Sequence, residues 1–290
     1  MASYDRELVV ILGPTAVGKT SWALEKAEEW GCPIIGCDSR QIYKGMSIGT
    51  AAPTSEELAR VKHYMVGVLE LTDYYSAAKY EEDVMKLLNT LFENHQRVIM
   101  SGGSMMYIDA VCNGIDDIPT IDKEVRNTLK QRLEKEGLDP LLAELRLLDP
   151  NYYHRVDLKN TRRVIHALEV CYTGGKPYSS YLVAHRKERT FKITKIGLRR
   201  EREDLFGRIN QRVDTMMEQG FMEEARRLYP YRHLNSLNTV GYKELFRVIS
   251  GEWPIDMAIE RIKKNTRVYA KKQMTWFNKD AEIAWTNLTK

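Results

Sequence analysis

The octapeptide Gly13-Pro14-Thr15-Ala16-Val17-Gly18-Lys19-Thr20 directly follows an apolar run at residues 8–12 and precedes a helical pattern. It matches the G-x-x-x-x-G-K-[ST] phosphate-binding loop in the strand-to-helix setting that this loop requires. Glycines let the backbone approach anionic oxygens, while successive N–H groups and the helix N-terminus supply partial positive charge. We expect Lys19 to add a full charge and the Thr20 hydroxyl to bind Mg²⁺. The whole octapeptide is therefore predicted to hold a di- or triphosphate.

The segments around this loop indicate the fold class. Residues 8–12, 34–37 and 97–100 have the apolar pattern of buried parallel strands, and residues 19–30 have the pattern of a helix. Such alternation predicts an α/β fold, a P-loop NTPase-like parallel sheet flanked by helices. Ligands of this fold class bind beyond the carboxyl ends of the strands. The residues that follow the strands, 38–41 and 101–104, should therefore lie beside the phosphate loop.

A change of pattern after residue 118 predicts a second domain. Asp122 and Asn160 are helix-capping residues in front of amphipathic segments, residues 138–148 form another such segment, and the last helix should stop at Gly174-Gly175. We expect residues 119–189 to form a helical insertion. Residues 1–118 and 190–290 should form the core domain, with a returning strand at 191–198. Helices are expected over the remainder, including a basic helix at about 255–277.

Composition is typical of a globular protein, with 43% hydrophobic and 29% charged residues among 290. No apolar run reaches the length of a membrane span, and the N-terminal stretch lacks the pattern of a signal peptide. We therefore expect a cytoplasmic protein without membrane contact. The four cysteines lack C-x-x-C spacing and are predicted to be buried and reduced. The six histidines lack ligand spacing, so no structural zinc is expected.

Positive charge is concentrated in two blocks. The C-terminal block, residues 261–279, contains seven Lys or Arg residues and no acid: Arg261, Lys263, Lys264, Arg267, Lys271, Lys272 and Lys279. The second block, residues 186–200, contains seven Lys or Arg residues and one acid, Glu188. Two such blocks beside a phosphate loop suggest a polyanion such as RNA, and solvated helix faces are the alternative explanation. Arg267 and Lys271 are the residues that we expect to contact RNA phosphates.

Asp38 is the only acid at the predicted edge of the sheet, because the strand ending at residue 100 runs into Ser-Gly-Gly-Ser. Three roles are open to it: a group near Mg²⁺, a general base that faces an acceptor, or the cap of the following turn. A single carboxylate beside a bound diphosphate suits removal of one proton from an acceptor.

Specific motifs extend over nearly the whole chain. They are Asp38-Ser-Arg-Gln-Ile-Tyr-Lys-Gly-Met-Ser-Ile-Gly-Thr-Ala-Ala-Pro53, Tyr75-Ser-Ala-Ala, Gly102-Gly-Ser-Met-Met-Tyr107, Arg163 with Ala167-Leu-Glu-Val170, Val240-Gly-Tyr-Lys243 and Thr266-Arg-Val-Tyr-Ala-Lys-Lys-Gln-Met-Thr-Trp-Phe277. Together with the phosphate loop, these segments resemble the tRNA dimethylallyltransferases, also called tRNA isopentenyltransferases. The resemblance implies transfer of a dimethylallyl group from dimethylallyl diphosphate to N6 of an adenosine beside the anticodon in tRNA.

The resemblance also implies roles for particular residues. Asp38 and Ser104 are the implied catalytic residues: Asp38 accepts the N6 proton, and Ser104 helps to place the amine and the diphosphate. The implied tRNA contacts are Asp38, Ser39, Arg40, Gln41, Ser104, Arg126, Arg162, Arg163, Val164, Ile165, His166, Asn238, Thr239, Val240, Gly241, Tyr242 and Lys243. Arg208 and Arg212, one helical turn apart, are candidates for a clamp on the diphosphate, or they belong to a solvated helix face.

Two other functions are compatible with parts of the sequence. A nucleotide or small-molecule kinase would share the phosphate loop and the strand order, but it would leave the C-terminal basic block unexplained. A non-catalytic RNA-binding switch with nucleotide as effector would explain the charge without chemistry. The partners expected from the main interpretation are dimethylallyl diphosphate, Mg²⁺ and the anticodon stem-loop of tRNA, and we expect a monomer.

Overall fold

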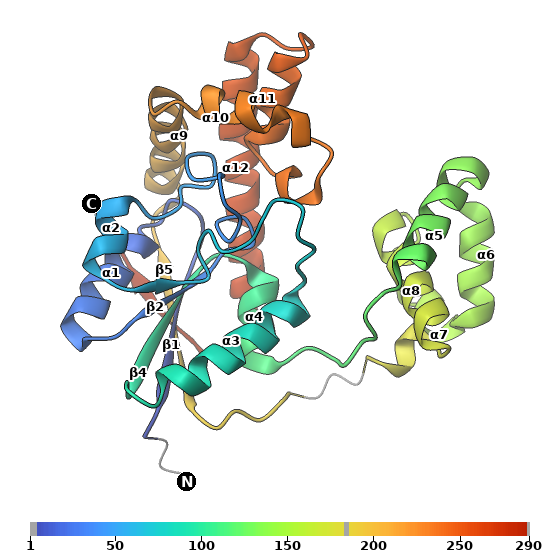
Figure 1. Ribbon diagram of the computed structural model, residues 1–290, viewed down its shortest axis with the longest axis horizontal. Coiled ribbons are helices and arrows are strands. Elements are labelled where there is room, and N and C mark those ends of the chain that lie inside the picture. The colour runs from blue at the N-terminus through green and yellow to red at the C-terminus, as the bar shows by residue number, and fades with distance from the viewer. Residues whose placement is uncertain (1–4, 183–185, 289–290) are drawn as a thin grey trace. The chain divides into compact units, whose positions relative to one another are not determined.

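The computed structural model of the chain describes residues 5–182 and 186–288. Within these residues, six strands form one parallel sheet in the order β3-β2-β4-β1-β5-β6. The strands are β1 (Glu7–Leu12), β2 (Ile34–Cys37), β3 (His63–Tyr64), β4 (Arg97–Gly102), β5 (Lys192–Arg199) and β6 (Ile283–Asn287). The predicted α/β fold, a parallel sheet flanked by helices, is confirmed (Figure 1).

The chain divides into two compact units, residues 1–112 with 188–290 and residues 113–187. The expected insertion, 119–189, starts six residues after the start of the second unit and ends two residues after its end. The helices that pack around the sheet are α1 (Lys19–Trp30), α2 (Ser55–Arg60), α3 (Ala77–Leu91), α4 (Met105–Asn113), α9 (Arg202–Glu218), α10 (Phe221–Leu228), α11 (Tyr242–Ile249) and α12 (Ile255–Phe277).

Strand β1 shows how the sheet separates two hydrophobic layers. Successive side chains of a strand point to opposite faces, so Leu8, Val10 and Leu12 join one layer, and Val9 and Ile11 join the other. The first layer contains most of the buried side chains of α3 and α4, and the second contains those of α1 together with Leu205 and Ile209 of α9. A continuous apolar strand is therefore what this position between two helical layers requires.

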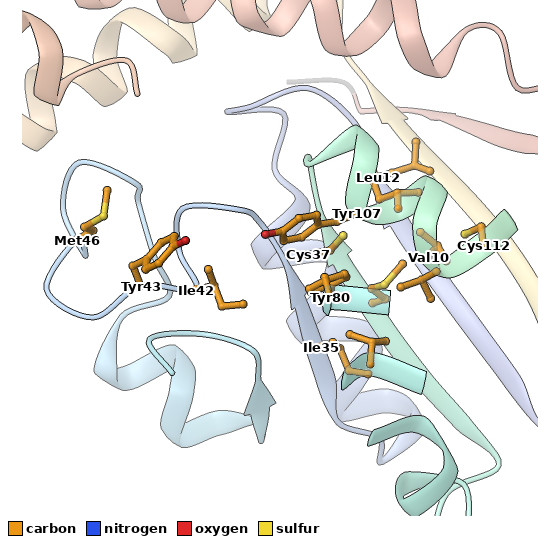
Figure 2. Packing of buried hydrophobic residues seen from close by; sticks show 14 of the residues in the cluster. Val10, Leu12, Ile35, Cys37, Ile42, Tyr43, Met46, Tyr80, Tyr107 and Cys112 are labelled. Atoms are coloured by element: carbon orange, nitrogen blue, oxygen red, sulfur yellow. The ribbon is translucent and has the colours of Figure 1, made fainter. Parts of the chain in front are cut away.

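Buried aromatic residues support the carboxyl end of β2, where Asp38 follows. The Tyr80 hydroxyl donates to the Gly36 carbonyl at 2.8 Å, and the Tyr80 and Tyr107 rings stack with centroids 4.1 Å apart. Figure 2 shows these rings from α3 and α4 close to Cys37 at the end of the strand. The prediction for the cysteines is confirmed, because all four are buried and free.

The unit formed by residues 113–187 has its own apolar core. Its helices are α5 (Lys123–Glu136), α6 (Asp139–Leu148), α7 (Pro150–Tyr153) and α8 (Thr161–Gly174). Leu129, Leu141 and Leu145 are among the buried residues that join three of these helices. The predicted caps are confirmed: the Asp122 side chain accepts from Glu124 N, and the Asn160 side chain accepts from Arg163 N. Helix α8 ends at Gly174, and its C-cap Gly175 has a left-handed backbone conformation.

The expectation of helices over the whole C-terminal part was wrong at its end. Residues 283–287 form β6, which pairs in parallel with β5 from Lys195↔Ile283 to Arg199↔Asn287. The reason is tertiary: Lys195, buried in β5, binds Asp280 at 2.7 Å and Glu282 at 2.9 Å and so holds the segment before β6 against the sheet. A strand of five residues has too little local signal to reveal such a partner.

Candidate active site at the carboxyl edge of the sheet

A cavity of about 820 Å³ opens at the carboxyl ends of β1, β2 and β4. The lining residues are Thr15, Ala16, Gly18, Lys19, Thr20 and Ser21; Asp38 and Gln41; Ser47, Ile48, Thr50, Ala51, Ala52, Pro53, Thr54, Ser55, Glu57 and Leu58; Ser101, Gly102 and Gly103; Arg208, Gln211, Arg212, Thr215, Met216 and Gln219; and Tyr269 and Gln273. The residues that follow three strands therefore lie around one space, as the fold class requires.

The phosphate loop has the backbone conformation of an anion cradle. Gly13 and Gly18 have φ angles of 147° and 113°, which residues with a side chain rarely adopt, and Ala16 is left-handed with φ 64°. Val17 N donates back to Pro14 O at 3.3 Å, which closes the loop. Within the described residues, no partner accepts from the N–H groups of Ala16, Gly18, Lys19 and Thr20. These groups can therefore bind anionic oxygens at the start of α1.

Lys19 lies inside this loop. Its ammonium donates to the carbonyls of Gly13 at 3.0 Å and Pro14 at 2.8 Å. Burial lowers the pKa of Lys19 to about 7, and the Arg212 guanidinium contributes in the same direction, partly offset by the Asp38 carboxylate. A bound polyanion would place negative charge beside the Lys19 ammonium and would therefore favour its charged form.

Arg208 and Arg212 of α9 are brought against the phosphate loop. Arg208 donates to Ala16 O at 3.0 Å, and Arg212 donates to the Thr15 hydroxyl at 3.4 Å. Burial lowers the pKa of Arg212, although an arginine remains charged at neutral pH. Both side chains line the cavity. Of the two interpretations, this geometry favours the diphosphate clamp and not the solvated helix face.

Asp38 combines a capping interaction with access to the cavity. Its Oδ1 accepts from Arg40 N at 2.8 Å and from Gln41 N at 3.2 Å, so Asp38 caps the turn after β2. Capping was one of the three roles left open by the sequence. Oδ2 accepts no hydrogen bond from the part of the chain that the structure describes. The other lining carboxylate, Glu57, accepts from Thr54 N in a capping box. Each of the two acids therefore keeps one oxygen without a partner among the described residues, and Asp38 is the one that directly follows a strand, at the carboxyl edge of the sheet.

Ser104 supports the turn that carries Asp38. It is 7% exposed, and its hydroxyl accepts from Ser39 N at 2.8 Å. Ser104 does not belong to the lining of the cavity. Its contact holds the residue next to Asp38, so its position suits support of the carboxylate.

Arg40 and Gln41 direct their side chains to backbone carbonyls. The Arg40 guanidinium donates to Asn235 O, Ser236 O and Asn238 O at 2.8–3.5 Å, and the Gln41 amide donates to Thr50 O and Ala51 O at 3.0 Å. Gln41 thus fixes a loop that lines the cavity, whereas Arg40 fixes the segment 235–238. Asn238 and Lys243 are exposed, and Thr239 and Val240 are half-buried.

Four of the residues expected to contact tRNA are buried and require a correction, and Ser104, described above, is one of them. Val164 is 0% exposed in the core of residues 113–187, and Tyr242 is 0% exposed with its hydroxyl 2.7 Å from Glu224. Gly241 is buried as well. The apolar faces of α8 and α11 must enter the core, so Val164 and Tyr242 support neighbouring residues that reach the surface.

The other expected contacts in the second unit lie on α5 and α8. Arg162 and Arg163 are exposed, and Ile165 is half-buried. Arg126 and His166 both approach Glu169, at 3.2 Å and 3.5 Å. Two of the expected contacts, Arg126 and His166, therefore lie beside one buried acid.

The two basic blocks differ. In the second block, Arg189 pairs with Glu81, Lys195 with Asp280, and Arg200 with Asp204, at 2.7–2.9 Å. These ion pairs hold the unit together, so the expectation that this block forms a polyanion surface was wrong for these three residues.

In the C-terminal block, Lys271 is exposed and lies over the Phe206 ring at 5.7 Å, while the Arg267 guanidinium donates to the Asn210 side chain. Both residues help α12 to pack on α9. The exposed members of the block are Arg261, Lys264, Lys271 and Lys272 on α12 and Lys279 just after it.

Among the lining residues that were not selected from the sequence, two come from α12. Tyr269 and Gln273 are one helical turn apart on α12, and both line the cavity. Burial, and then the Asp38 carboxylate, raise the pKa of Tyr269, which keeps its phenol protonated. An i, i+4 pair of this kind was visible in the sequence, but its direction depends on how α12 crosses the sheet.

Within the described ranges, no cluster of three His, Cys, Asp or Glu residues is placed to hold a metal ion. None of the described helices combines the length and the apolar character needed to cross a bilayer.

Comparisons with known proteins agree with the geometry. The family described as IPP transferase matches residues 41–280. The tRNA dimethylallyltransferase 2 of Parabacteroides distasonis is 62% identical over 278 residues, 96% of this chain and 93% of that protein. The tRNA dimethylallyltransferase 1 of Bacteroides thetaiotaomicron is 59% identical over 278 residues, 96% of this chain and 90% of that protein.

Two solved structures are similar. The full-length tRNA isopentenylpyrophosphate transferase of Bacillus halodurans has a TM-score of 0.70 and 33% identity, over 97% of this chain and 90% of that chain. A eukaryotic dimethylallyltransferase acting on tRNA has a TM-score of 0.84 over 97% of this chain and 74% of that chain, and at 24% identity it supports the fold alone. Because relatives that are more than half identical cover almost the whole sequence, the resemblance to the tRNA dimethylallyltransferases is confirmed, and the chain belongs to the IPP transferase family.

Proposed function

We propose that this protein transfers a dimethylallyl group from dimethylallyl diphosphate to N6 of the adenosine adjacent to the anticodon in tRNA, with release of diphosphate. One observation carries the proposal. In a chain of the IPP transferase family, a phosphate loop and the carboxylate that directly follows β2, Asp38, line the same cavity of about 820 Å³. This volume lies in the range of sites that enclose small-molecule ligands.

The phosphate loop serves a leaving group in this proposal. Ionisation of an allylic diphosphate breaks the C1–O bond, and the electron pair leaves with the diphosphate. The loop N–H groups, Lys19 and the Arg208–Arg212 pair would stabilise the negative charge that develops on the departing oxygen. Fixed donors of this kind act without reorganising during the reaction.

The residues beside the phosphate loop are suited to bind Mg²⁺. Thr20 is exposed there at the start of α1, and hydroxyl oxygens together with phosphate oxygens and water are ligands that Mg²⁺ accepts. Thr20 would hold the ion, and the ion would supply positive charge next to the diphosphate. The protein residues named above perform the remaining steps.

Asp38 acts on the acceptor. The N6 lone pair forms the bond to C1 while Asp38 Oδ2 takes the proton from N6, so that charge and atoms balance. Ser104 holds Ser39 and thereby the turn, whereas Oδ1 of Asp38 is occupied by the two backbone N–H groups. An adenine must leave its stack to reach this edge, which single-stranded loops of RNA permit.

The anticodon stem-loop is the part of tRNA that we propose as the partner. Exposed basic residues on both units, among them Arg162, Arg163, Lys243 and Lys271, would contact its phosphates. Residues 113–187 would thus act as the tRNA-contacting insertion, and the protein would act as a monomer in the cytoplasm.

The proposal is tested by incubating the protein and Mg²⁺ with unmodified tRNA and either dimethylallyl diphosphate or ATP. The tRNA is then digested and its nucleosides are analysed by mass spectrometry. Prenylated adenosine should form only with the allylic donor, at the position next to the anticodon. Phosphorylated product or rapid ATP hydrolysis, with no prenylated nucleoside, would favour a kinase and contradict the proposal.

A further inference from the structure

Gln273 of α12 makes two contacts that join the phosphate loop to the end of β4. Its Oε1 accepts from Thr15 N at 2.9 Å, and its Nε2 donates to Gly103 O at 2.8 Å. The side chain is 1% exposed, so both bonds are shielded from water. Buried bonds of this type hold their partners in fixed relative positions, because breaking them leaves polar groups unsatisfied.

Residue 103 is adapted to this contact. A Cβ at Gly103 would lie 2.3 Å from Gln273 Nε2, a distance that atoms cannot adopt without movement. The close approach of the Gln273 amide therefore requires glycine here. The hydrogen bond from the Gln273 amide to Gly103 O therefore depends on the absence of a side chain at position 103.

The two bonds are part of a longer connection. Gly103 is followed by Ser104, whose hydroxyl accepts from Ser39 N, and Ser39 is adjacent to Asp38. The segments that follow β1, β4 and β2 are thus linked in series from Thr15 through Gln273 to Asp38. One end of this series cradles the diphosphate, and the other end carries the proposed base.

We propose that Gln273 is a positioning residue that sets the distance between the diphosphate cradle and Asp38 during prenyl transfer. The inference rests on the proposed function. Gln273 also occupies the Thr15 N–H, which leaves the N–H groups of Ala16, Gly18, Lys19 and Thr20 to face the diphosphate. Displacement of reacting groups by about 1 Å can slow a reaction by about 10²-fold.

The test compares Gln273→Met, which removes both bonds at similar volume, with Gln273→Glu, which keeps an acceptor for Thr15 N and loses the donor to Gly103 O. Single-turnover prenyl transfer at saturating donor and tRNA should slow by about 10- to 10²-fold in both variants. Affinity for tRNA should stay within about threefold, because Gln273 is buried away from solvent. Binding of inorganic diphosphate, measured by calorimetry, shows whether the loop still folds.

Ile262→Ala provides the matched control, since Ile262 is buried in α12 and its side chain belongs to the hydrophobic core. It should lower the thermal midpoint while the rate per folded molecule stays at the wild-type value. Gln273 variants that lose rate only in proportion to the unfolded fraction, or that keep rates within about threefold of wild type, would overturn the proposal. Absence of prenyl transfer by the wild-type protein would instead contradict the proposed function, and the diphosphate titration would still report on the loop.

Discussion

Asp38 shows how one side chain can have a structural and a chemical role. One oxygen caps the turn after β2 through Arg40 N and Gln41 N, and the other has no partner among the described residues. An asparagine in its place would keep a side-chain oxygen for the two N–H groups, but it has no basic lone pair at the second position. The two roles can therefore be separated by a single substitution.

We expect Asp38→Asn to reduce the single-turnover rate by about 10²- to 10⁴-fold, the usual contribution of a general base, with a small change in tRNA affinity. The thermal midpoint should remain at the wild-type value because the cap survives. Rates at saturating tRNA and donor, measured beside thermal unfolding, distinguish the roles. A stable variant with nearly the wild-type rate would leave Asp38 with the capping role alone.

Lys19 predicts a pH dependence of donor binding. Burial lowers its pKa to about 7, so the free protein carries a charged Lys19 below that pH and loses the charge as pH rises. A bound diphosphate favours the charged form and raises the pKa again, so binding above about pH 7 must take up a proton. Affinity for the donor should fall by up to about tenfold per pH unit above this value.

Calorimetry at about pH 8.5 in buffers of different ionisation enthalpy measures this uptake. Close to one proton should enter on binding of a non-reactive donor analogue to the wild type, and none should enter with Lys19→Met. Equal uptake by both proteins would assign the proton to another group and contradict the prediction.

At the scale of elements, a buried carboxylate attaches the cavity loop to α10 and α11. Glu224 is 2% exposed and accepts from Ile48 N and Gly49 N at 2.9 Å and from the Tyr242 hydroxyl at 2.7 Å. Ile48 lines the cavity in the same segment as Ala51. This acid therefore determines where one wall of the cavity lies.

Glu224→Gln should lower the free energy of unfolding by about 1–3 kcal/mol, because an amide N–H would then face a backbone N–H that is left without an acceptor. Chemical denaturation measures the change. Glu223→Gln is the matched control on the same helix, since Glu223 is exposed and lies 3.9 Å from Arg226, and it should change stability by less than about 0.5 kcal/mol. Equal stabilities of the two variants would show that the loop does not depend on Glu224.

The elements also show what the sequence could predict. Helix starts at Asp122 and Asn160 were predictable because a cap acts on residues two or three positions away. Ion pairs were not predictable, because their partners are far apart in the sequence. Arg189 and Glu81 are separated by 108 positions, and Lys195 and Asp280 by 85 positions. The same limit applied to Gln273, whose partner Thr15 lies 258 positions away. The predicted phosphate loop, by contrast, is a local motif whose chemistry is contained in eight residues.

At the scale of the whole molecule, the segments that lead into and out of residues 113–187 are joined to each other. Lys187 N donates to Asn113 O at 2.8 Å, and Lys187 binds Asp117 at 3.0 Å. Arg189, the next basic residue in the core unit, donates to Ala110 O and Val111 O and pairs with Glu81. The chain therefore leaves the core unit and returns to it at neighbouring points, and part of the second basic block holds these points together.

The remaining surface charge on α12 predicts how tRNA affinity responds to salt. Each phosphate contact releases counterions, so log affinity falls linearly with log salt, by a slope of about 0.7–0.9 for each contact. Replacing Arg267 and Lys271 by glutamine should weaken the binding of all substrate tRNAs alike. It should also flatten the slope of log affinity against log salt by about one unit for each phosphate that is no longer bound. Donor binding should not change, because neither residue lines the cavity.

Replacing Lys86 and Lys192 by glutamine removes the same net charge elsewhere. Lys192 begins β5, at the amino edge of the parallel sheet, and pairs with Glu7 at 3.2 Å, while Lys86 pairs with Glu82 at 2.6 Å. This control should leave the slope unchanged, because the phosphates are expected at the carboxyl edge. Equal slopes for the wild type and the Arg267–Lys271 variant would mean that these residues serve only the packing of α12 on α9. A slope that falls equally in both double variants would indicate attraction by net charge, without localised contacts on α12.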